Sequence, residues 1–240
     1  MNFKECVNRV DKWDKDKILK YNGVGGPVFT KIFKFASFFG RETIWFFVIA
    51  FYLFVWYDPF LFVYIGATFM NGLIFILIVK NGVKRARPFD VMKEIKVLEL
   101  KPTSLSFPSW HAYNVISQAL LIGFLTKSPL VLLLLIAFAI LVCFSRVQLG
   151  VHYPTDVIFG AILGACGFIF TWFFMGPLFL IIVGYFESIS THGIYYAQIN
   201  PMIFREFWYT ALCIAVFGGI TFSSIYKFVF GPKEKGNKKN

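Results

Sequence analysis

Residues 145–156 read SRVQLGVHYPTD and separate two long apolar runs, which start near Leu130 and Val157. Between these runs the stretch places an Arg, a His and an Asp, at positions 146, 152 and 156. Ionisable side chains are costly close to the hydrocarbon core of a bilayer, so those found there are candidates for function. Taken alone, the stretch would equally suit an ordinary polar turn between two helices.

Composition indicates an integral membrane protein. The 240-residue chain has a mean hydropathy of +0.66 and is only 15% charged, whereas soluble domains are about 25% charged. Apolar runs of about 20 residues recur along it, and this length suffices for a helix to cross a membrane. We therefore expect an all-α, polytopic membrane helix bundle with about six transmembrane helices, at residues 43–57, 60–79, 111–126, 130–144, 157–186 and 207–230.

The N-terminal segment predicts an amphipathic helix that lies on the membrane surface. Its apolar residues that fall roughly on one helical face are Phe3, Val7, Val10, Trp13 and Ile18. We expect an amphipathic N-terminal segment at residues 1–41, a membrane-embedded domain at residues 42–230, and a basic, disordered tail at residues 231–240.

The charge and the cysteines limit the partners. In a membrane protein, a net charge of +11 indicates contact with anionic headgroups or substrates rather than with nucleic acid. The four cysteines show no CxxC or Cys/His ligand spacing, so we predict no metal site and no cofactor. The oligomeric state stays open.

Two more polar clusters precede the opening stretch. Lys80 and Arg87 are seven residues apart, so a helix that continued to Pro88 would place both cations on one face, where they suit a phosphate. Ser109 is a good N-cap for the next apolar run. It would place His111 in the first helical turn, where free backbone N–H groups favour an anion.

In the opening stretch, His152 and Asp156 are four residues apart and would meet on one helical face. The carboxylate could then hold one imidazole N–H. Arg146 adds a third cation. If the six spans alternate, residues 80–110 and 145–156 lie on the same membrane face. Each cluster alone also suits an interfacial flank or a capped helix, but their convergence favours one site.

Together these residues resemble the motifs of the type-2 phosphatidic acid phosphatase superfamily, which also contains glucose-6-phosphatase and the vanadium haloperoxidases. Its motifs are a Lys and an Arg-Pro separated by six residues, a Pro-Ser-Gly-His, and a Ser-Arg followed by His after five residues and Asp after three more. The matching residues are Lys80, Arg87, Pro88, Pro108, Ser109, His111, Ser145, Arg146, His152 and Asp156. Trp110 replaces the motif's Gly, which keeps a backbone N–H there but would be strained at a positive φ.

The resemblance implies a membrane phosphatase that needs no metal ion. His152 would form a phosphohistidine, Asp156 would orient it, and His111 would protonate the leaving group. The phosphoryl oxygens would be held by Lys80, Arg87, Ser109, Arg146 and the N–H of Trp110. The implied substrate is a lipid phosphate or pyrophosphate among membrane lipids. The alternatives are a lipid phosphotransferase with the same phosphohistidine, and a transporter or channel in which these groups form an ion path.

Charge and resemblance disagree about the side of the membrane. Both ends of the chain and residues 80–110 are basic, whereas the opposite loops carry few charges. The positive-inside rule therefore predicts a cytoplasmic site. Membrane members of the similar superfamily usually face their site away from the cytoplasm, so the side stays open.

Overall fold

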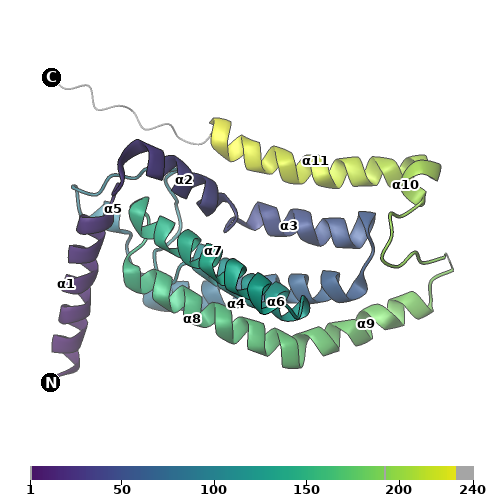
Figure 1. Cartoon of the computed structure of the whole chain (residues 1–240), viewed down its shortest axis with the longest axis horizontal. Coiled ribbons are helices and arrows are strands. Elements are labelled where there is room, and N and C mark those ends of the chain that lie inside the picture. The colour runs from purple at the N-terminus through teal and green to yellow at the C-terminus, as the bar shows by residue number, and fades with distance from the viewer. Residues whose placement is uncertain (1, 192, 231–240) are drawn as a thin grey trace.

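Helix α6 (Trp110–Leu125) runs through the middle of a bundle of longer apolar helices (Figure 1). The structure, a computed structural model, describes residues 2–191 and 193–230, and its regular elements there are helical. The predicted all-α membrane bundle is confirmed, while the predicted tail at 231–240 lies outside the described residues. The other elements are α1 (Phe3–Tyr21), α2 (Gly26–Phe38), α3 (Glu42–Ala50), the π-helical turn η1 (Phe51–Val55), α4 (Pro59–Val83), α5 (Pro88–Val91), α7 (Pro129–Gln148), α8 (Pro154–Phe170), the π-helical turn η2 (Thr171–Met175), α9 (Gly176–Ser188), α10 (Met202–Arg205) and α11 (Phe207–Phe230).

Fewer helices than the predicted six are long and apolar enough to span a membrane. Within the described residues four stretches qualify: Pro59–Val91, Pro129–Gln148, Pro154–Ser188 and Phe207–Tyr226. The pair α2 and α3–η1, bent by 42°, makes a fifth if it forms one span. Helix α6, predicted as a span at 111–126, is not among them, because it has only 16 residues; α4, α7 and α8 pack around it.

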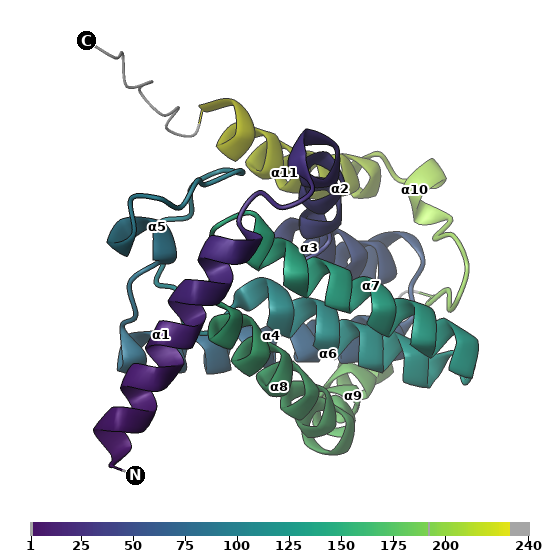
Figure 2. The same cartoon turned by 60° about the vertical axis from the view of Figure 1, so that its left-hand side comes forward.

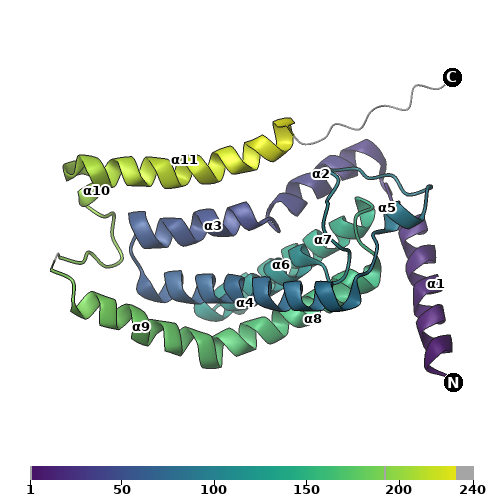
Figure 3. The same cartoon turned by 180° about the vertical axis from the view of Figure 1, so that it is seen from behind.

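Polar bonds tie α6 to α4, which lies beside it (Figure 3). The side chain of Gln118 donates to the carbonyl of Ile65 at 3.1 Å, and the hydroxyl of Tyr113 donates to the carbonyl of Thr68 at 3.0 Å. Polar groups inside a membrane protein need protein partners, because the hydrocarbon offers none. These bonds fix the position of α6 within the bundle.

Helix α8 packs closely on α6 because two glycines leave room for it. A Cβ on Gly160 would lie 2.5 Å from the carbonyl oxygen of Ser109, and one on Gly164 would lie 2.7 Å from that of Tyr113. Small residues one turn apart allow this kind of approach. The first turns of the two helices are thereby brought together, and the N–H of Ser109 donates to the carbonyl of Asp156 at 2.9 Å.

Helix α1 runs across one end of the bundle (Figures 1 and 2). Ile18 is fully buried against the bundle, whereas Val7 and Val10 are 48% and 43% exposed. The predicted apolar face therefore packs on the protein only near the C-terminal end of the helix. The other end extends past the bundle and leaves apolar side chains free to meet the membrane surface.

Candidate active site

The residues predicted for the site meet at the end of the bundle next to α1. A pocket of about 580 Å³ is lined by six of them: Lys80, Arg87, Trp110, His111, Arg146 and His152. Ser109 and Asp156 are fully buried and are not among its lining residues. The segments 80–110 and 145–156 thus lie on one face, as the alternation of spans requires.

A tight turn brings His152 back to the end of α7. Gly150 has a φ of +77°, which glycine adopts without strain, and its N–H donates to the carbonyl of Val147 at 3.0 Å. The N–H of His152 then reaches the carbonyl of Arg146 at 3.3 Å. Helix α8 begins only at Pro154, so the prediction that His152 and Asp156 share a helical face is wrong.

His152 nevertheless contacts Asp156, because the carboxylate lies in the first turn of α8. The Nδ1 atom of His152 is 3.5 Å from Oδ2 of Asp156, close enough for an electrostatic contact, although Nδ1 makes no hydrogen bond among the described residues. Its Nε2 atom is 3.3 Å from Nη1 of Arg87. A guanidinium can only donate, so Nε2 accepts and a neutral ring carries its proton on Nδ1.

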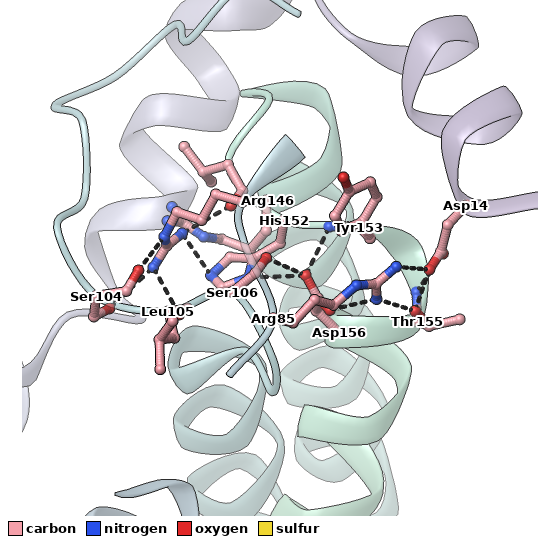
Figure 4. Close-up of polar contacts among 12 residues, drawn as sticks. Asp14, Arg85, Ser104, Leu105, Ser106, Arg146, His152, Tyr153, Thr155 and Asp156 are labelled. Atoms are coloured by element: carbon pink, nitrogen blue, oxygen red, sulfur yellow. Dashed lines mark hydrogen bonds and ion pairs between the residues drawn. The ribbon is translucent and has the colours of Figure 1, made fainter. Parts of the chain in front are cut away.

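Three groups donate hydrogen bonds to the carboxylate of Asp156 (Figure 4). The hydroxyl of Ser106 and the N–H of Tyr153 donate to Oδ2, the latter at 2.9 Å. Nη1 of Arg85 donates to Oδ1 at 2.8 Å. The carboxylate therefore keeps one orientation, with Oδ2 toward His152.

The side chains of Lys80 and Arg87 both donate hydrogen bonds to the loop that contains Ser104 and Leu105. Nζ of Lys80 donates to the carbonyl of Leu105 at 2.5 Å, and Nε of Arg87 donates to the carbonyl of Ser104 at 2.5 Å. The prediction of one helix through both cations is wrong: α4 ends at Val83, and Lys84 follows with a φ of +50°. The chain then runs extended, and the shared loop brings the two cations together.

Arg146 is paired with an acid that sequence reasoning missed. Its Nη2 atom lies 2.6 Å from Oε1 of Glu99, and its Nη1 donates to the hydroxyl of Ser37. The side chains of Arg146 and Glu99 are only 2% and 7% exposed. The pocket therefore contains a carboxylate beside its cations.

Ser109, Trp110 and His111 form the start of α6. Ser109 is the N-cap residue as predicted, but its side chain makes no capping bond, and its Oγ atom is buried with no hydrogen-bond partner among the described residues. Trp110 is the first helical residue and does not have a positive φ, so replacing the motif's Gly causes no strain there. Its ring packs on Phe69 and Tyr113, at centroid distances of 5.3 and 6.0 Å.

Burial lowers the pKa of His152 well below its ordinary value, and the nearby charges of Arg87, Arg146 and Lys80 lower it further. Desolvation and like charge both disfavour the imidazolium form. His152 is therefore a neutral base at neutral pH. The lone pair on its Nε2 atom points toward the cations and accepts from Arg87.

The structure adds residues that no motif marked. Besides Glu99, these are Asp14, Arg85, Ser104 and Ser106. Arg85 lies within the first motif's spacer, and its position two residues before Arg87 was the only available signal. Among the described residues, no group of three or more His, Cys, Asp or Glu is arranged to hold a metal ion.

A second, mostly apolar cavity of about 960 Å³ adjoins the pocket. It lies between α2, α3, α11 and residues 97–101, and its lining shares Arg41, Glu99 and Lys101 with that of the pocket. Phe35, Phe47 and Ile220 are among its apolar residues. A polar pocket is thus continuous with an apolar one.

Known proteins are similar to the chain in sequence and in fold. The sequence profile of the PAP2 superfamily matches residues 59–180. Undecaprenyl-diphosphatase of Sulfolobus acidocaldarius is 33% identical over 149 residues, which are 62% of this chain and 71% of that protein. Decaprenylphosphoryl-5-phosphoribose phosphatase of Mycobacterium tuberculosis is 42% identical over 89 residues, 37% of this chain and 47% of that protein. The crystal structure of a transmembrane PAP2 type phosphatidylglycerolphosphate phosphatase from Bacillus subtilis superposes with a TM-score of 0.56 at 22% identity, over 78% of this chain and 90% of that one.

The profile match at residues 59–180 includes all three motifs. The chain therefore belongs to the PAP2 superfamily of phosphatases, as the motifs predict, and it is an integral, multi-pass membrane member.

Proposed function

We propose that the protein is a membrane phosphatase that hydrolyses a lipid phosphate or pyrophosphate through a phosphohistidine at His152. The orientation of the His152 ring carries this proposal, because Nδ1 faces Asp156 while Nε2 faces the cations of the pocket. A neutral imidazole held in this way is a nucleophile. The cations Lys80, Arg87 and Arg146 suit the charge on a phosphoryl group during its transfer.

The proposed reaction has two steps. Nε2 of His152 bonds to phosphorus as the bond from phosphorus to the leaving oxygen breaks. His111 gives that oxygen its proton, and because burial and the nearby cations favour neutral His111, the anionic substrate must stabilise its protonated form. Water then attacks phosphorus, His111 takes a proton from the water, and the N–P bond breaks to release phosphate. Asp156 offsets the positive charge that the ring of His152 carries in between. Ser109 and the N–H of Trp110 complete the set of groups for the phosphoryl oxygens.

A lipid substrate fits the two adjoining cavities. The phosphate group would lie among the cations of the pocket, and the hydrocarbon tail would extend into the apolar cavity between α3 and α11. Arg41 and Lys101 at the junction suit a second phosphate. Because the relative from Sulfolobus acidocaldarius is an undecaprenyl-diphosphatase, a polyprenyl diphosphate is the first substrate to test.

Phosphate release from purified protein tests the proposal. The panel comprises a polyprenyl diphosphate, phosphatidic acid, phosphatidylglycerol phosphate and, as the soluble control, glucose 6-phosphate. We expect release from at least one lipid and none after His152→Ala, with a chelator having no effect. Release by the His152→Ala variant would contradict the phosphohistidine, and transfer of phosphate to an added alcohol in preference to water would identify a phosphotransferase.

The orienting role of Asp156 needs a separate variant. Asp156→Asn should lower kcat strongly, but the amide also loses acceptor capacity toward Arg85 and Tyr153. We therefore expect a loss of stability of about 2 kcal/mol or more alongside it. Thermal unfolding in the same detergent separates the two effects. A kcat equal to that of the wild type would contradict the role.

A further inference from the structure

Asp14 of α1 is a fully buried carboxylate that does not line the catalytic pocket. It lies on the face of α1 that packs on the bundle, one turn before Ile18. Its partners are on α8 and on the segment between α4 and α5 (Figure 4). A buried carboxylate is costly unless it is paired, so these contacts stabilise the charge of Asp14.

The first contact is with the start of α8. Oδ1 of Asp14 accepts from the N–H of Thr155 at 3.0 Å, and Oδ2 accepts from the hydroxyl of the same residue. Tyr153 at the N-cap provides no side-chain capping bond, and Pro154 has no N–H. Asp14 thus does from a distant helix what an N-cap side chain normally does. It fixes the residue directly before Asp156.

The second contact is with Arg85, which bridges two acids. Its Nη2 atom lies 2.7 Å from Oδ2 of Asp14, and its Nη1 atom lies 2.8 Å from Oδ1 of Asp156. The planar guanidinium presents these donors in a rigid fork, so fixing one end fixes the other. The ring of Tyr153 lies 4.0 Å below the fork and limits its movement further.

Negative and positive charges alternate along the series Asp14, Arg85 and Asp156. Asp14 offsets part of the positive charge of Arg85, so Asp156 keeps more of its negative charge available for His152. Without the carboxylate of Asp14, Arg85 would interact more strongly with Asp156. Its Nη2 atom would keep only the longer contact to Asp11, at 3.8 Å, so the guanidinium would be held less firmly. Both changes weaken the hold of Asp156 on Nδ1 of His152.

We propose that Asp14 is a positioning residue for the reaction, acting through Arg85 and Thr155 on Asp156. The inference rests on the proposed role of His152 as the nucleophile. The PAP2 profile begins at residue 59, so this residue lies outside the region that defines the superfamily. The N-terminal helix is then part of the catalytic apparatus as well as a membrane-surface element.

A merely structural role makes a different prediction. Helix α1 has a second attachment at Asn22, whose side chain donates to the carbonyl of Gln148 at 3.1 Å and accepts from the N–H of Lys96 at 2.8 Å. Neutralising Asp14 should therefore leave α1 attached. A lower kcat with unchanged KM and unchanged thermal stability would indicate that Asp14 positions the catalytic residues.

Kinetics of phosphate release from farnesyl diphosphate in detergent micelles provide the test. We expect Asp14→Asn to lower kcat about tenfold, with KM within about twofold of the wild type. Asp14→Glu should restore part of kcat. Asp16→Asn is the matched control, because it makes the same charge change at an exposed position of the same helix and should leave kcat unchanged.

If Asp14→Asn does not fold, Arg85→Gln replaces it, with the same expected loss of kcat at unchanged KM. A wild-type kcat in either folded variant would overturn the inference, as would a loss that only follows thermal stability. His152→Ala is measured in parallel. If His152→Ala is inactive while Asp14→Asn has the kcat of the wild type, only the positioning role of Asp14 fails. If His152→Ala is active, the proposed function fails.

Discussion

The two ring nitrogens of His152 face different neighbours, and this difference is measurable. We expect ¹⁵N NMR of the histidine rings to show a neutral His152 with its proton on Nδ1 at pH 7. Because the pKa is lowered, the ring should stay neutral below the ordinary value of about 6.5. Inorganic phosphate should raise this pKa, because an anion offsets the nearby cations.

The chain has three histidines, so the spectrum of a His152→Gln variant assigns the resonance. Protonation of His152 above the ordinary pKa would contradict the burial and charge argument. A proton on Nε2 would contradict the contact with Arg87.

Glu99 beside Arg146 should weaken phosphate binding, because it competes for the guanidinium and repels an anion. We expect Glu99→Gln to lower the inhibition constant of inorganic phosphate by about tenfold, which is about 1.4 kcal/mol. Glu94→Gln, at an exposed position, is the control and should leave inhibition unchanged. Equal or weaker inhibition of the Glu99→Gln variant would show that Glu99 does not oppose the phosphate.

The sequence predicted the motif residues of the site but not their supports. Lys80, Arg87, Arg146 and His152 stand in recognisable spacings, and the structure brings them into one pocket. Glu99 and Asp14 could not be found in this way, because an acidic residue in a charged segment reads as ordinary surface. Their partners lie 47 and 71 residues away, at Arg146 and Arg85, and only the folded chain brings them together.

At the scale of elements, the close packing of α8 on α6 holds the carboxylate in place. Gly164→Ala would put a methyl group 2.7 Å from the carbonyl of Tyr113, so the backbones must separate. We expect a loss of stability of about 1–3 kcal/mol, read as a lower midpoint of thermal unfolding, together with a lower kcat. Gly184→Ala is the matched control, because nothing lies within 4 Å of its added Cβ. Equal stability of the two variants would contradict this packing argument.

The ends of the helices were harder to predict from the sequence than the helices themselves. Pro59, Pro129 and Pro154 each begin a helix, which the sequence indicates because proline suits the first turn. The end of α4 gave no such signal, because Lys84 takes the left-handed conformation that glycine usually provides. The bend in the long α8–α9 helix is marked by Gly176-Pro177, and η2 lies directly before it (Figure 1).

For the whole molecule, α1 and the C-terminal end of α11 lie at one end of the bundle (Figure 1). The site lies beside α1, and Ser128, the N-cap residue of α7, lies a full helix away from the site residue Arg146. We therefore expect an impermeant maleimide to label exposed Cys6 and a Ser128→Cys variant from opposite sides of sealed vesicles. Cys166, exposed within an apolar helix, is replaced by Ala in both proteins. Labelling of both positions from one side would contradict the alternation of spans, and the side that labels Cys6 is the side of the site.

Composition predicted the class of fold and most apolar helices, because the thickness of the hydrocarbon core sets the length of the apolar runs that cross it. It also predicted a span at α6, which has 16 residues, is shorter than the four helices long enough to span, and is largely surrounded by protein. Arg41 is the N-cap of α3, yet the division of the chain at residue 41 stays a prediction.

The apolar cavity beside the pocket also bears on how the proposed enzyme meets its substrate. It adjoins α11, of which only 6% of the most apolar segment is buried, so a lipid can arrive sideways from the bilayer. The enzyme and its substrate then meet by diffusion within the membrane plane. Turnover should follow the mole fraction of substrate in the membrane rather than its concentration in the whole sample. Detergent alkyl chains dilute that surface and compete for the same cavity. Activity should therefore fall as detergent is added at constant total lipid.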